Sequence, residues 1–445
     1  MTSQNEGFGE FTVKNLGECT VDSPLRIPNF REEDERVLAD PTIRNCQDCQ
    51  YYNSMPPSFE LAGPRKKLFF NPVTARAGIV TCGGLCPGLN DVIHGLVMEL
   101  WHRYGTWTIY GFQYGYRGLV PRWGNPPVLL DPEKVKHIHE DGGTILSSSR
   151  GHQSVAECVD TLENLGINLL FCIGGDGTLR GAYELQEEIC KRGLPTAVVG
   201  IPKTIDNDIS WVEKSFGFET AFSKAREAVL SAHTEAEGAL NGVGLVKLMG
   251  RESGYVAVMT ALSMTHVNFV LVPEVPFDLS GEKGLFAALK KRIERRHHAV
   301  IVVAEGAGQS LMASDPQGCE KDASGNIRLK DVGNFLKDKI KAQFSSQGIP
   351  LNIKYIDPSY IIRSVPANAA DSVYCMQLAQ NAVHAAMAGK TGVVIGCWAG
   401  HFTHLPIPMA ISTRNTVDPN GDLWMHVLEA TGQPYSMVNH RSEGE

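Results

Sequence analysis

The sequence predicts an α/β protein whose chain folds into two domains, each built on a largely parallel β-sheet. Short apolar runs of strand length alternate with longer segments of helical periodicity, which is typical of parallel sheets. Several apolar runs end in glycine-rich loops, as strands do where they leave a ligand-binding sheet. Roughly nine or more strands over some 370 of the 445 residues suggest two domains rather than one.

The alternation begins near residue 77. Residues 77–82 are predicted to form a first strand, 83–88 its loop and 90–103 a helix. Residues 1–74 carry a charged run at 31–36 and are predicted to form an N-terminal extension. Further strands are predicted at 169–173, 196–201, 242–247, 268–272 and 299–304, with helical segments between them that include 179–192 and 284–294.

Composition narrows the class of protein. Hydrophobic residues make up 43% and charged residues 20% of the chain, as in ordinary globular proteins. The formal net charge of −8 argues against a general nucleic-acid binder, and no apolar run reaches the length of a membrane span. The odd count of 11 cysteines favours reduced thiols and a cytosolic setting. Cys46 and Cys49 form a CxxC pair without the second pair that a zinc site needs.

The strongest chemical signal is Gly174-Gly175-Asp176-Gly177-Thr178, directly after a strand-like run. Glycines allow backbone N–H groups to approach phosphate oxygens closely, and the following helix would offer its N-terminus to an anion. The carboxylate of Asp176 can hold Mg²⁺, and the hydroxyl of Thr178 can donate to a phosphate. The motif predicts a phosphate site, although a tight strand-to-helix turn explains it too.

A second element, Pro202-Lys203-Thr204-Ile205-Asp206-Asn207-Asp208, follows the next strand-like run. Phosphoryl transfer needs positive charge at the moving group and a base near the attacking hydroxyl, and this stretch contains both. Aspartate and asparagine also cap helices and form turns, but capping needs only one such residue. Because parallel strands present their carboxyl ends at one edge, the two loops are expected to converge on one phosphate.

Other charged groups also follow strand-like runs or lie in glycine-rich loops. Arg150 lies in the Gly/Ser-rich stretch 142–151, and Arg251 follows Met249 and Gly250 at a strand end. Glu305 follows another strand and suits sugar hydroxyls, while Lys354 and Arg363 add cations for a second phosphate. Each could equally be a solvated loop residue, so the prediction depends on the whole set.

Taken together, these motifs resemble the 6-phosphofructokinase family. The stretches that carry the resemblance, in the family's order over roughly residues 75–412, are GGLCPGLN (83–90), GFQYGYRGL (111–119), GGTILSSSRG (142–151), GGDGT (174–178), PKTIDND (202–208), MGR (249–251), AEG (304–306) and YIIR (360–363). The N-terminal extension, the first loop and the segment around 355–363 look most like the plant and trypanosomatid branch of the ATP-dependent enzymes.

The resemblance implies an enzyme of glycolysis with two Rossmann-like three-layer domains and an active site in the cleft between them. An ATP-binding domain would span 75–216 with about 361–412, and a sugar-phosphate-binding domain 217–360 with about 413–445. Mg²⁺-dependent transfer from ATP would phosphorylate the 1-hydroxyl of fructose 6-phosphate. The family further implies an allosteric, cytoplasmic homotetramer.

The family's functional residues carry over onto matching positions. Asp206 would be the general base, oriented by Thr204, and Arg150 and Arg251 would stabilise charge on the moving group. Asp176 would hold Mg²⁺. The nucleotide would lie against Gly84, Tyr116, Arg150, Gly151, Gly175, Asp176, Gly177 and Thr178. The sugar phosphate would contact Thr204, Ile205, Asp206, Met249, Gly250, Arg251, Glu305, Lys354, Tyr360, Ile361, Ile362 and Arg363.

Gly177 and Lys203 bear on the phosphoryl donor. In the family, pyrophosphate users carry Asp at the first position and Lys at the second, whereas bacterial ATP users carry Gly at both. The mixed pair here favours ATP, because an aspartate at 177 would fill the space of the α-phosphate and repel it. A pyrophosphate-dependent enzyme and a catalytically silent regulatory subunit are the alternatives.

Two departures from the bacterial pattern affect the 6-phosphate site. Where bacterial enzymes use arginines from a neighbouring subunit, this chain has Gly242 and Lys354. Lys354 keeps a charge but cannot form a bidentate fork, and Gly242 has no side chain. Part of that phosphate site is therefore expected to be rebuilt or lost.

Overall fold

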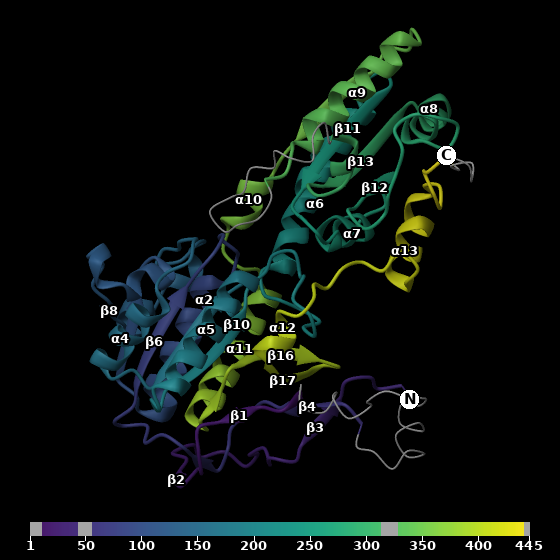
Figure 1. Ribbon diagram of the computed structural model, residues 1–445. Coiled ribbons are helices and arrows are strands. Elements are labelled where there is room, and N and C mark those ends of the chain that lie inside the picture. The colour runs from purple at the N-terminus through teal and green to yellow at the C-terminus, as the bar shows by residue number, and fades with distance from the viewer. Residues whose placement is uncertain (1–10, 43–55, 313–327, 440–445) are drawn as a thin grey trace. The chain divides into compact units, whose positions relative to one another are not determined.

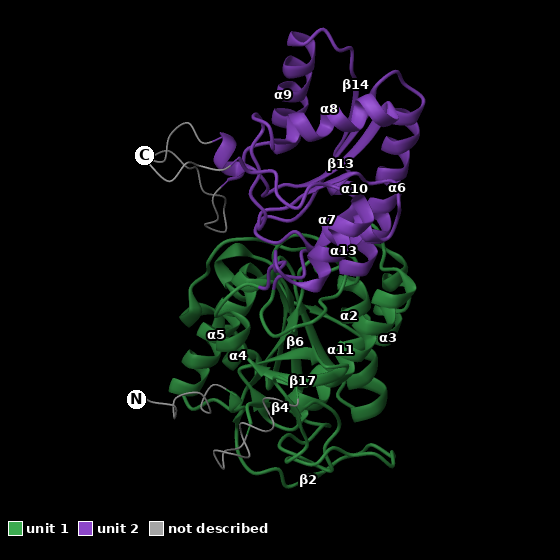
Figure 2. Cartoon of the chain, turned by 90° about the vertical axis from the view of Figure 1, so that its right-hand side faces the viewer, with its two compact units in different colours: residues 1–204, 209–217, 364–414 green, residues 205–208, 218–363, 415–445 purple. Residues whose placement is uncertain are grey.

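The computed structural model describes residues 11–42, 56–312 and 328–439. The chain divides into two compact units (Figure 2). Unit 1 consists of Met1–Thr204, Ile209–Gly217 and Ser364–Arg414, and unit 2 of Ile205–Asp208, Phe218–Arg363 and Asn415–Glu445. Cys46 and Cys49 lie outside the described residues.

Unit 1 is built on one large mixed sheet (Figure 1). Its central strands are parallel and the strands at both edges are antiparallel, as a βαβ core extended by hairpins requires. In spatial order the strands are β3 (Arg36–Leu38), β4 (Ser58–Leu61), β17 (His401–Pro406), β16 (Val393–Trp398), β10 (Ala197–Pro202), β9 (Leu169–Gly174), β6 (Arg76–Thr81), β7 (Thr108–Phe112) and β8 (Val128–Leu129).

Helices cover both faces of this sheet. On one face, α4 (Val155–Leu165) packs against α5 (Asp176–Lys191), which contacts β9 and β10. On the other face, α11 (Ala369–Met387) contacts the same strands and packs along α2 (Leu89–Met98). β9 and β10 are buried along their whole length, because helices cover them on both sides. The shorter elements are α3 (Pro132–Val135), α12 (Ile407–Ala410) and the 3₁₀ turns η3 (Gly115–Leu119), η4 (Pro121–Trp123) and η5 (Ile138–Glu140).

Unit 2 contains a smaller, fully parallel sheet in the order β12 (Phe269–Leu271), β13 (His298–Ala304), β11 (Gly242–Leu248) and β14 (Asn352–Ile356). Alternate side chains of β11 enter different cores, as the two-residue period of a strand requires. Val246 and Leu248 pack with α6 (Phe218–Glu237) and α7 (Tyr255–Leu262), whereas Val243 and Leu245 pack with α8 (Leu285–Arg296) and α9 (Val332–Ser346). The remaining elements are α10 (Ser359–Arg363), α13 (Asp422–Thr431) and η6 (Gln309–Met312).

The predicted α/β fold with parallel-rich, three-layer units is therefore confirmed, and so are the predicted strands. Two helix boundaries differ. The helix predicted at 90–103 changes at Met98 into a π-helix, η2 (Glu99–Tyr104), that ends at Gly105. The helix predicted from residue 179 already begins at Asp176, because the carboxylate is stabilised in the first turn of a helix.

The described part of the predicted N-terminal extension is built into unit 1. β1 (Lys14–Asn15) pairs with β15 (Lys390–Thr391), β2 (Val21–Asp22) pairs with β5 (Lys67–Leu68), and β4 joins the large sheet beside β17. The first and the last of these pairings connect segments more than 300 residues apart in the sequence.

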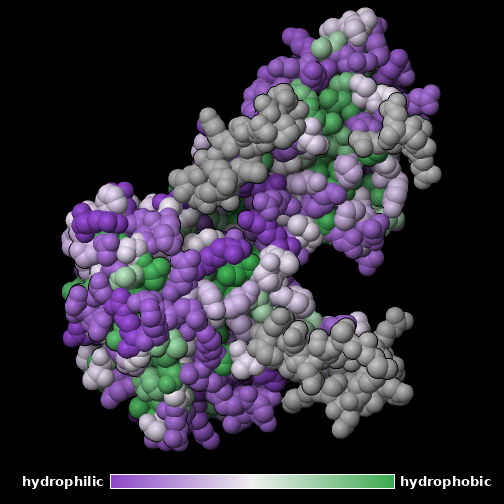
Figure 3. Space-filling view, viewed as in Figure 1, coloured by the Kyte–Doolittle hydropathy of each residue, from purple (hydrophilic) through white to green (hydrophobic). Residues whose placement is uncertain are grey.

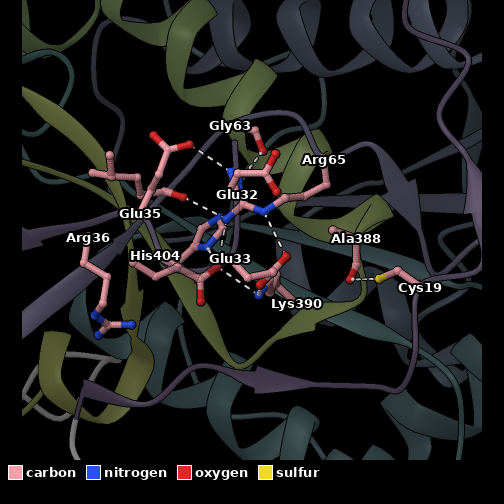
Figure 4. Close-up of polar contacts among 12 residues, drawn as sticks. Cys19, Glu32, Glu33, Glu35, Arg36, Gly63, Arg65, Ala388, Lys390 and His404 are labelled. Atoms are coloured by element: carbon pink, nitrogen blue, oxygen red, sulfur yellow. Dashed lines mark hydrogen bonds and ion pairs between the residues drawn. The ribbon is translucent and has the colours of Figure 1, made fainter. Parts of the chain in front are cut away.

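An ion cluster that is buried except at Glu33 reinforces this attachment (Figure 4). Glu60 accepts hydrogen bonds from Arg65 at 3.0 Å, Lys390 at 2.9 Å and His404 at 2.9 Å. Glu33 accepts from the same Arg65 and Lys390, at 3.0 and 2.6 Å. Although burial opposes ionisation, these donors lower the pKa of Glu60 well below its usual value. The charges of the two carboxylates balance those of Arg65 and Lys390. Burial lowers the pKa of His404, which favours the neutral imidazole that donates from Nδ1 to Glu60.

The face drawn in Figure 3 is mostly hydrophilic, with smaller apolar areas between the charged side chains. Among the helices within the described ranges, none is both long and apolar enough to cross a membrane.

Candidate active site

The predicted phosphate loops of unit 1 converge at the carboxyl ends of β6, β9 and β10. Lys203, only 6% exposed, donates from Nζ to the carbonyl of Gly84 at 2.6 Å. Its backbone N–H donates to Gly174 at 3.0 Å, and its carbonyl oxygen lies 3.2 Å from where a Cβ on Gly175 would be. Lys203 therefore joins the 83–88 loop to the 174–178 loop.

The loop that carries Arg150 meets the same place. The hydroxyl of Ser148 donates to the carbonyl of Gly83 at 2.7 Å, and the N–H of Gly83 donates to Ser149 at 3.1 Å. A Cβ added to Gly84 would lie 3.4 Å from Nη2 of Arg150. The guanidinium of Arg150 thus lies beside a loop whose glycines leave the backbone open to a phosphate.

Asp176 and Gly177 form the first turn of α5. Oδ2 of Asp176 lies 3.2 Å from Nε of Arg180 and 3.8 Å from Arg414. A Cβ added to Gly177 would meet nothing within 4 Å, so this position borders open space. Gly174 is different, because a Cβ there would lie 2.1 Å from the hydroxyl of Thr178.

Tyr116 contacts the first two turns of α5. Its hydroxyl donates to the carbonyl of Thr178 at 2.6 Å, and its ring lies close enough to Gly181 that a Cβ there would come within 2.7 Å. Burial raises the pKa of Tyr116 far above its usual value, so the phenol stays protonated and can donate. Tyr116 thus holds the start of α5 in place.

Asp176 is the acidic group in this site that could hold Mg²⁺. Among the described residues, no group of three or more His, Cys, Asp or Glu side chains is arranged to hold a metal ion. Mg²⁺ is usually bound through one or two carboxylates together with substrate phosphates and water, and a single carboxylate, 31% exposed, fits that pattern.

In unit 2, Asp206 lies among charged groups. Burial raises the pKa of Asp206 to about 8, and the negative charges of Asp208 and Glu305 act in the same direction. The backbone N–H of Arg251 donates to its carboxylate and its guanidinium attracts it, which opposes this rise. Asn207, between the two aspartates, has a φ of 56°, in the left-handed region that asparagine adopts more readily than most residues. A carboxyl group with a pKa near 8 is suited to accept a proton near neutral pH.

Two glycines allow the MGR and AEG loops to lie against each other. The N–H of Gly306 donates to the carbonyl of Gly250 at 2.9 Å, and that of Glu305 donates to Leu248 at 2.9 Å. A Cβ on Gly306 would lie 1.8 Å from the carbonyl oxygen of Arg251, so only glycine fits there. Burial raises the pKa of Glu305, and the neighbouring Arg251 opposes this.

The remaining predicted sugar-phosphate residues are on β14 and α10. The Arg363 guanidinium stacks 4.5 Å from the ring centroid of Tyr360, which is 75% exposed. Ile361 is exposed, whereas Ile362 is fully buried in the core and can support the helix only from inside. Lys354 forms an ion pair with Glu235 at 3.4 Å.

Ile205 and Met249 pack into the core beside α6 and α7, while the carbonyl of Thr204 in unit 1 accepts a hydrogen bond from Ser215. At Gly242, a Cβ would lie 2.0 Å from the carbonyl oxygen of Ala236, so close packing of α6 on β11 accounts for the missing arginine.

The sequence interpretation missed Lys247 and Asp357. Their side chains form a 2.7 Å ion pair, and both act electrostatically on the carboxylate of Glu305. Lys247 was detectable as the one charged side chain in the buried strand 242–248, because a buried charge needs a partner or a function.

With this geometry in view, the comparisons with known proteins decide the family. The sequence profile of phosphofructokinase matches residues 76–386. The chain belongs to the phosphofructokinase family. An ATP-dependent 6-phosphofructokinase of Borreliella burgdorferi is 49% identical to it, and the match covers 98% of this chain and 99% of that enzyme. An enzyme of the same name from Amycolatopsis methanolica is 48% identical, and the match covers 96% of this chain and 95% of that enzyme. ATP-dependent 6-phosphofructokinase 7 of Arabidopsis thaliana is 49% identical, over 84% and 77%.

Solved phosphofructokinases share the fold. A pyrophosphate-dependent enzyme from Marinobacter aquaeolei superposes with a TM-score of 0.65 at 18% identity, covering 82% of this chain and 94% of its own. The enzyme of Pichia pastoris gives a TM-score of 0.60 at 20% identity, covering 85% and 38%. Identities this low describe the phosphofructokinase fold and not the donor.

Proposed function

We propose that this chain is an ATP-dependent 6-phosphofructokinase, which transfers a phosphoryl group from ATP to the 1-hydroxyl of fructose 6-phosphate in glycolysis. The observation that carries the proposal is near full-length similarity, at 48–49% identity, to two enzymes with that name. The open space at Gly177 agrees with it, because the α-phosphate of ATP needs room that an aspartate would occupy.

In this proposal, unit 1 holds ATP. Gly84, Arg150, Gly151 and the 175–178 turn contact its phosphates, with the α5 N-terminus contributing its positive end. Mg²⁺ on Asp176 would neutralise phosphate charge when bound. Lys203 adds a cation that lies against Gly84 and is compatible with ATP.

Unit 2 holds the sugar phosphate and the base. Asp206 takes the proton from the 1-hydroxyl as the oxygen attacks, and Thr204 orients it. Arg251 and Arg150 stabilise charge on the transferring group, and Met249, Gly250 and Glu305 position the sugar. Tyr360 and Arg363 meet the 6-phosphate, together with Ile361, Ile362 and Lys354. Positioning and charge neutralisation supply the catalysis, and no covalent intermediate is required.

The remaining family properties belong to the same proposal. We place the enzyme in the cytoplasm as an allosteric homotetramer, although two of the Arabidopsis relatives are named chloroplastic. Light scattering of the purified chain after size-exclusion chromatography would measure its mass; a mass other than four times that of the chain would contradict the tetramer.

A coupled assay with fructose 6-phosphate and Mg²⁺, run in parallel with ATP and with pyrophosphate, tests the function. Turnover with ATP alone is expected. Turnover with pyrophosphate alone would show that Lys203, rather than Gly177, decides the donor. Binding of both substrates without turnover would instead support a silent regulatory subunit.

A further inference from the structure

A polar cavity lies in unit 1, and it is lined by none of the residues proposed to bind ATP or the sugar. It has a volume of about 350 Å³, which is within the range of small-ligand sites. Three separate parts of unit 1 line it: the N-terminal segment 24–27, the π-helix η2 and the helix α11. The lining side chains of the two helices are Glu99, His102, Arg103, Gln380 and His384.

The π-helix is the unusual element. π-Helical turns are rare and occur frequently at functional sites, because the extra residue per turn redirects the side chains. Here the change from α2 to η2 falls at Glu99, the first of its residues that line the cavity.

Three of the residues that line this cavity are exposed basic side chains. Arg26 comes from the N-terminal segment, and His102 and Arg103 from η2. Basic residues in a last helical turn can serve only to stabilise the helix end, which would explain His102 and Arg103. That explanation leaves out Arg26, which belongs to a segment more than 70 residues away. In a chain of net charge −8, two arginines and a histidine at one cavity favour an oxyanion.

The buried side chains of the cavity are polar. Glu99 is 7% exposed; burial raises its pKa, whereas the charge of Arg103 and a hydrogen bond with Gln380 oppose that rise. Burial lowers the pKa of His384 to about 3, and its Nδ1 lies 2.8 Å from the hydroxyl of Tyr104. Such groups offer donors and acceptors to hydroxyl or amide groups. Pro24, Leu25 and Ile27 supply an apolar wall.

We propose that this cavity binds a small phosphate ester. Its phosphate lies against Arg26, His102 and Arg103, and its hydroxyl-bearing part lies against Glu99 and Gln380. Because the ligand contacts both segment 24–27 and α11, it strengthens the attachment of the N-terminal segment to unit 1. α11 is followed by β15, which carries Lys390 of the ion cluster, so both features connect N-terminal residues to the α11–β15 part of unit 1.

Isothermal titration of the full chain with ribose 5-phosphate tests the proposal. Saturating fructose 6-phosphate and a non-hydrolysable ATP analogue are present, so that the proposed active-site residues are occupied. Ribose and inorganic phosphate are titrated separately to divide the contributions of the two halves of the probe. We expect ribose 5-phosphate to bind more tightly than either, and to raise the melting temperature.

Substitutions then locate the site. Arg103→Gln and Arg26→Gln should each weaken binding at least about tenfold, the scale of a charge-assisted hydrogen bond. Arg295→Gln, at an exposed arginine of α8, is the matched control and should change nothing. Gln380→Leu should weaken the binding of ribose 5-phosphate and leave the binding of inorganic phosphate unchanged.

Several outcomes would overturn the proposal. These are no binding of ribose 5-phosphate at millimolar concentration, equal affinity for ribose or for inorganic phosphate, or affinities in both arginine variants equal to that of the control. Both substituted arginines are exposed, so the variants should fold, and their circular dichroism spectra verify this.

Discussion

Asp206 combines burial with the charges that a general base needs to accept a proton near neutral pH. Its carboxyl lies with Asp208, Glu305 and Arg251 within unit 2. This environment raises the basicity of the Asp206 carboxylate, which suits a general base. It also makes the ionised carboxylate costly to bury, so folding becomes less favourable at higher pH.

Replacing Asp206 with Asn should lower turnover by at least ~10², the scale of a general base, while substrate binding persists. The variant should also be more stable than the wild type at pH 8. The folded-state pKa of Asp206 exceeds its unfolded value, so its proton is retained between about pH 4 and 8 only in the folded protein, and stability declines as pH rises. Thermal melts at pH 5 and 8 should show a difference that grows with pH; turnover close to that of the wild type would exclude Asp206 as the base.

The pH dependence of kcat/KM provides a second prediction. Since the base must be ionised, activity should fall as pH decreases below about 8, the pKa of Asp206 in the free protein. Asp208→Asn removes a like charge, so the acid side of the profile should move to lower pH. Asp422→Asn, an exposed residue of α13, is the control. An unmoved midpoint in Asp208→Asn would show that another group controls the profile.

Substitutions at Gly177 test the choice of phosphoryl donor. Gly177→Ala should keep most ATP-dependent activity, because a Cβ there meets nothing within 4 Å. Gly177→Asp adds both bulk and a negative charge beside the phosphates, and should lower kcat/KM for ATP by more than about tenfold. Steady-state kinetics of both variants would measure this; equal effects of Ala and Asp would mean that backbone freedom, not charge and space, matters.

At the scale of elements, strand ends and helix starts bring the loops together. β9 and β10 run parallel in register from Leu169–Ala197 to Gly174–Pro202, so their loops leave the sheet at the same level. The glycines at 84, 174, 250 and 306 then let these loops approach one another or a ligand. The N-terminal segments depend on a different device, the buried ion cluster around Glu60.

Glu60→Gln should destabilise the protein by up to ~3–5 kcal/mol, because the buried cations of Arg65 and Lys390 would keep only the largely exposed Glu33 as a carboxylate partner. Glu187→Gln, which removes an exposed ion pair with Lys14, should cost less than ~1 kcal/mol. Because the pKa of Glu60 is depressed on folding, its stabilisation is present above its unfolded pKa and is lost as pH falls. The free energy of unfolding, measured in urea at pH 4 and at pH 7, should therefore change less between the two pH values for the variant than for the wild type. Equal destabilisation by the two glutamate changes would refute the cluster's role.

At the scale of the whole molecule, two units with separate cores carry the two proposed binding roles. The residues proposed for ATP lie in unit 1, and those proposed for the sugar phosphate lie in unit 2, with Thr204 the exception. The segment 202–208 passes from one unit to the other between Thr204 and Ile205.

This division predicts selective stabilisation by ligands. Scanning calorimetry with a non-hydrolysable ATP analogue should shift the part of the unfolding transition that belongs to unit 1, and fructose 6-phosphate the part that belongs to unit 2, following mass action. Limited proteolysis during heating, read by mass spectrometry, would assign each part. Equal protection of both units by either ligand alone would contradict separate binding.

The sequence by itself determined the fold class, the family and six of the strands, because hydrophobic periodicity and strand-end motifs are local properties of the chain. It did not predict β7, β14, β16 or β17. It also placed Asp206, Arg251 and Glu305 at strand ends, from which the structure gathers them in unit 2. Only the tertiary structure decided what depends on contacts between distant segments. It paired Lys247 with Asp357 and placed the Tyr116 hydroxyl on α5. It also buried Glu60 among Arg65, Lys390 and His404, and opened a cavity between residues 24–27, η2 and α11. The free energy of a buried charge or a cavity wall depends on neighbours that packing supplies, and no local pattern encodes them.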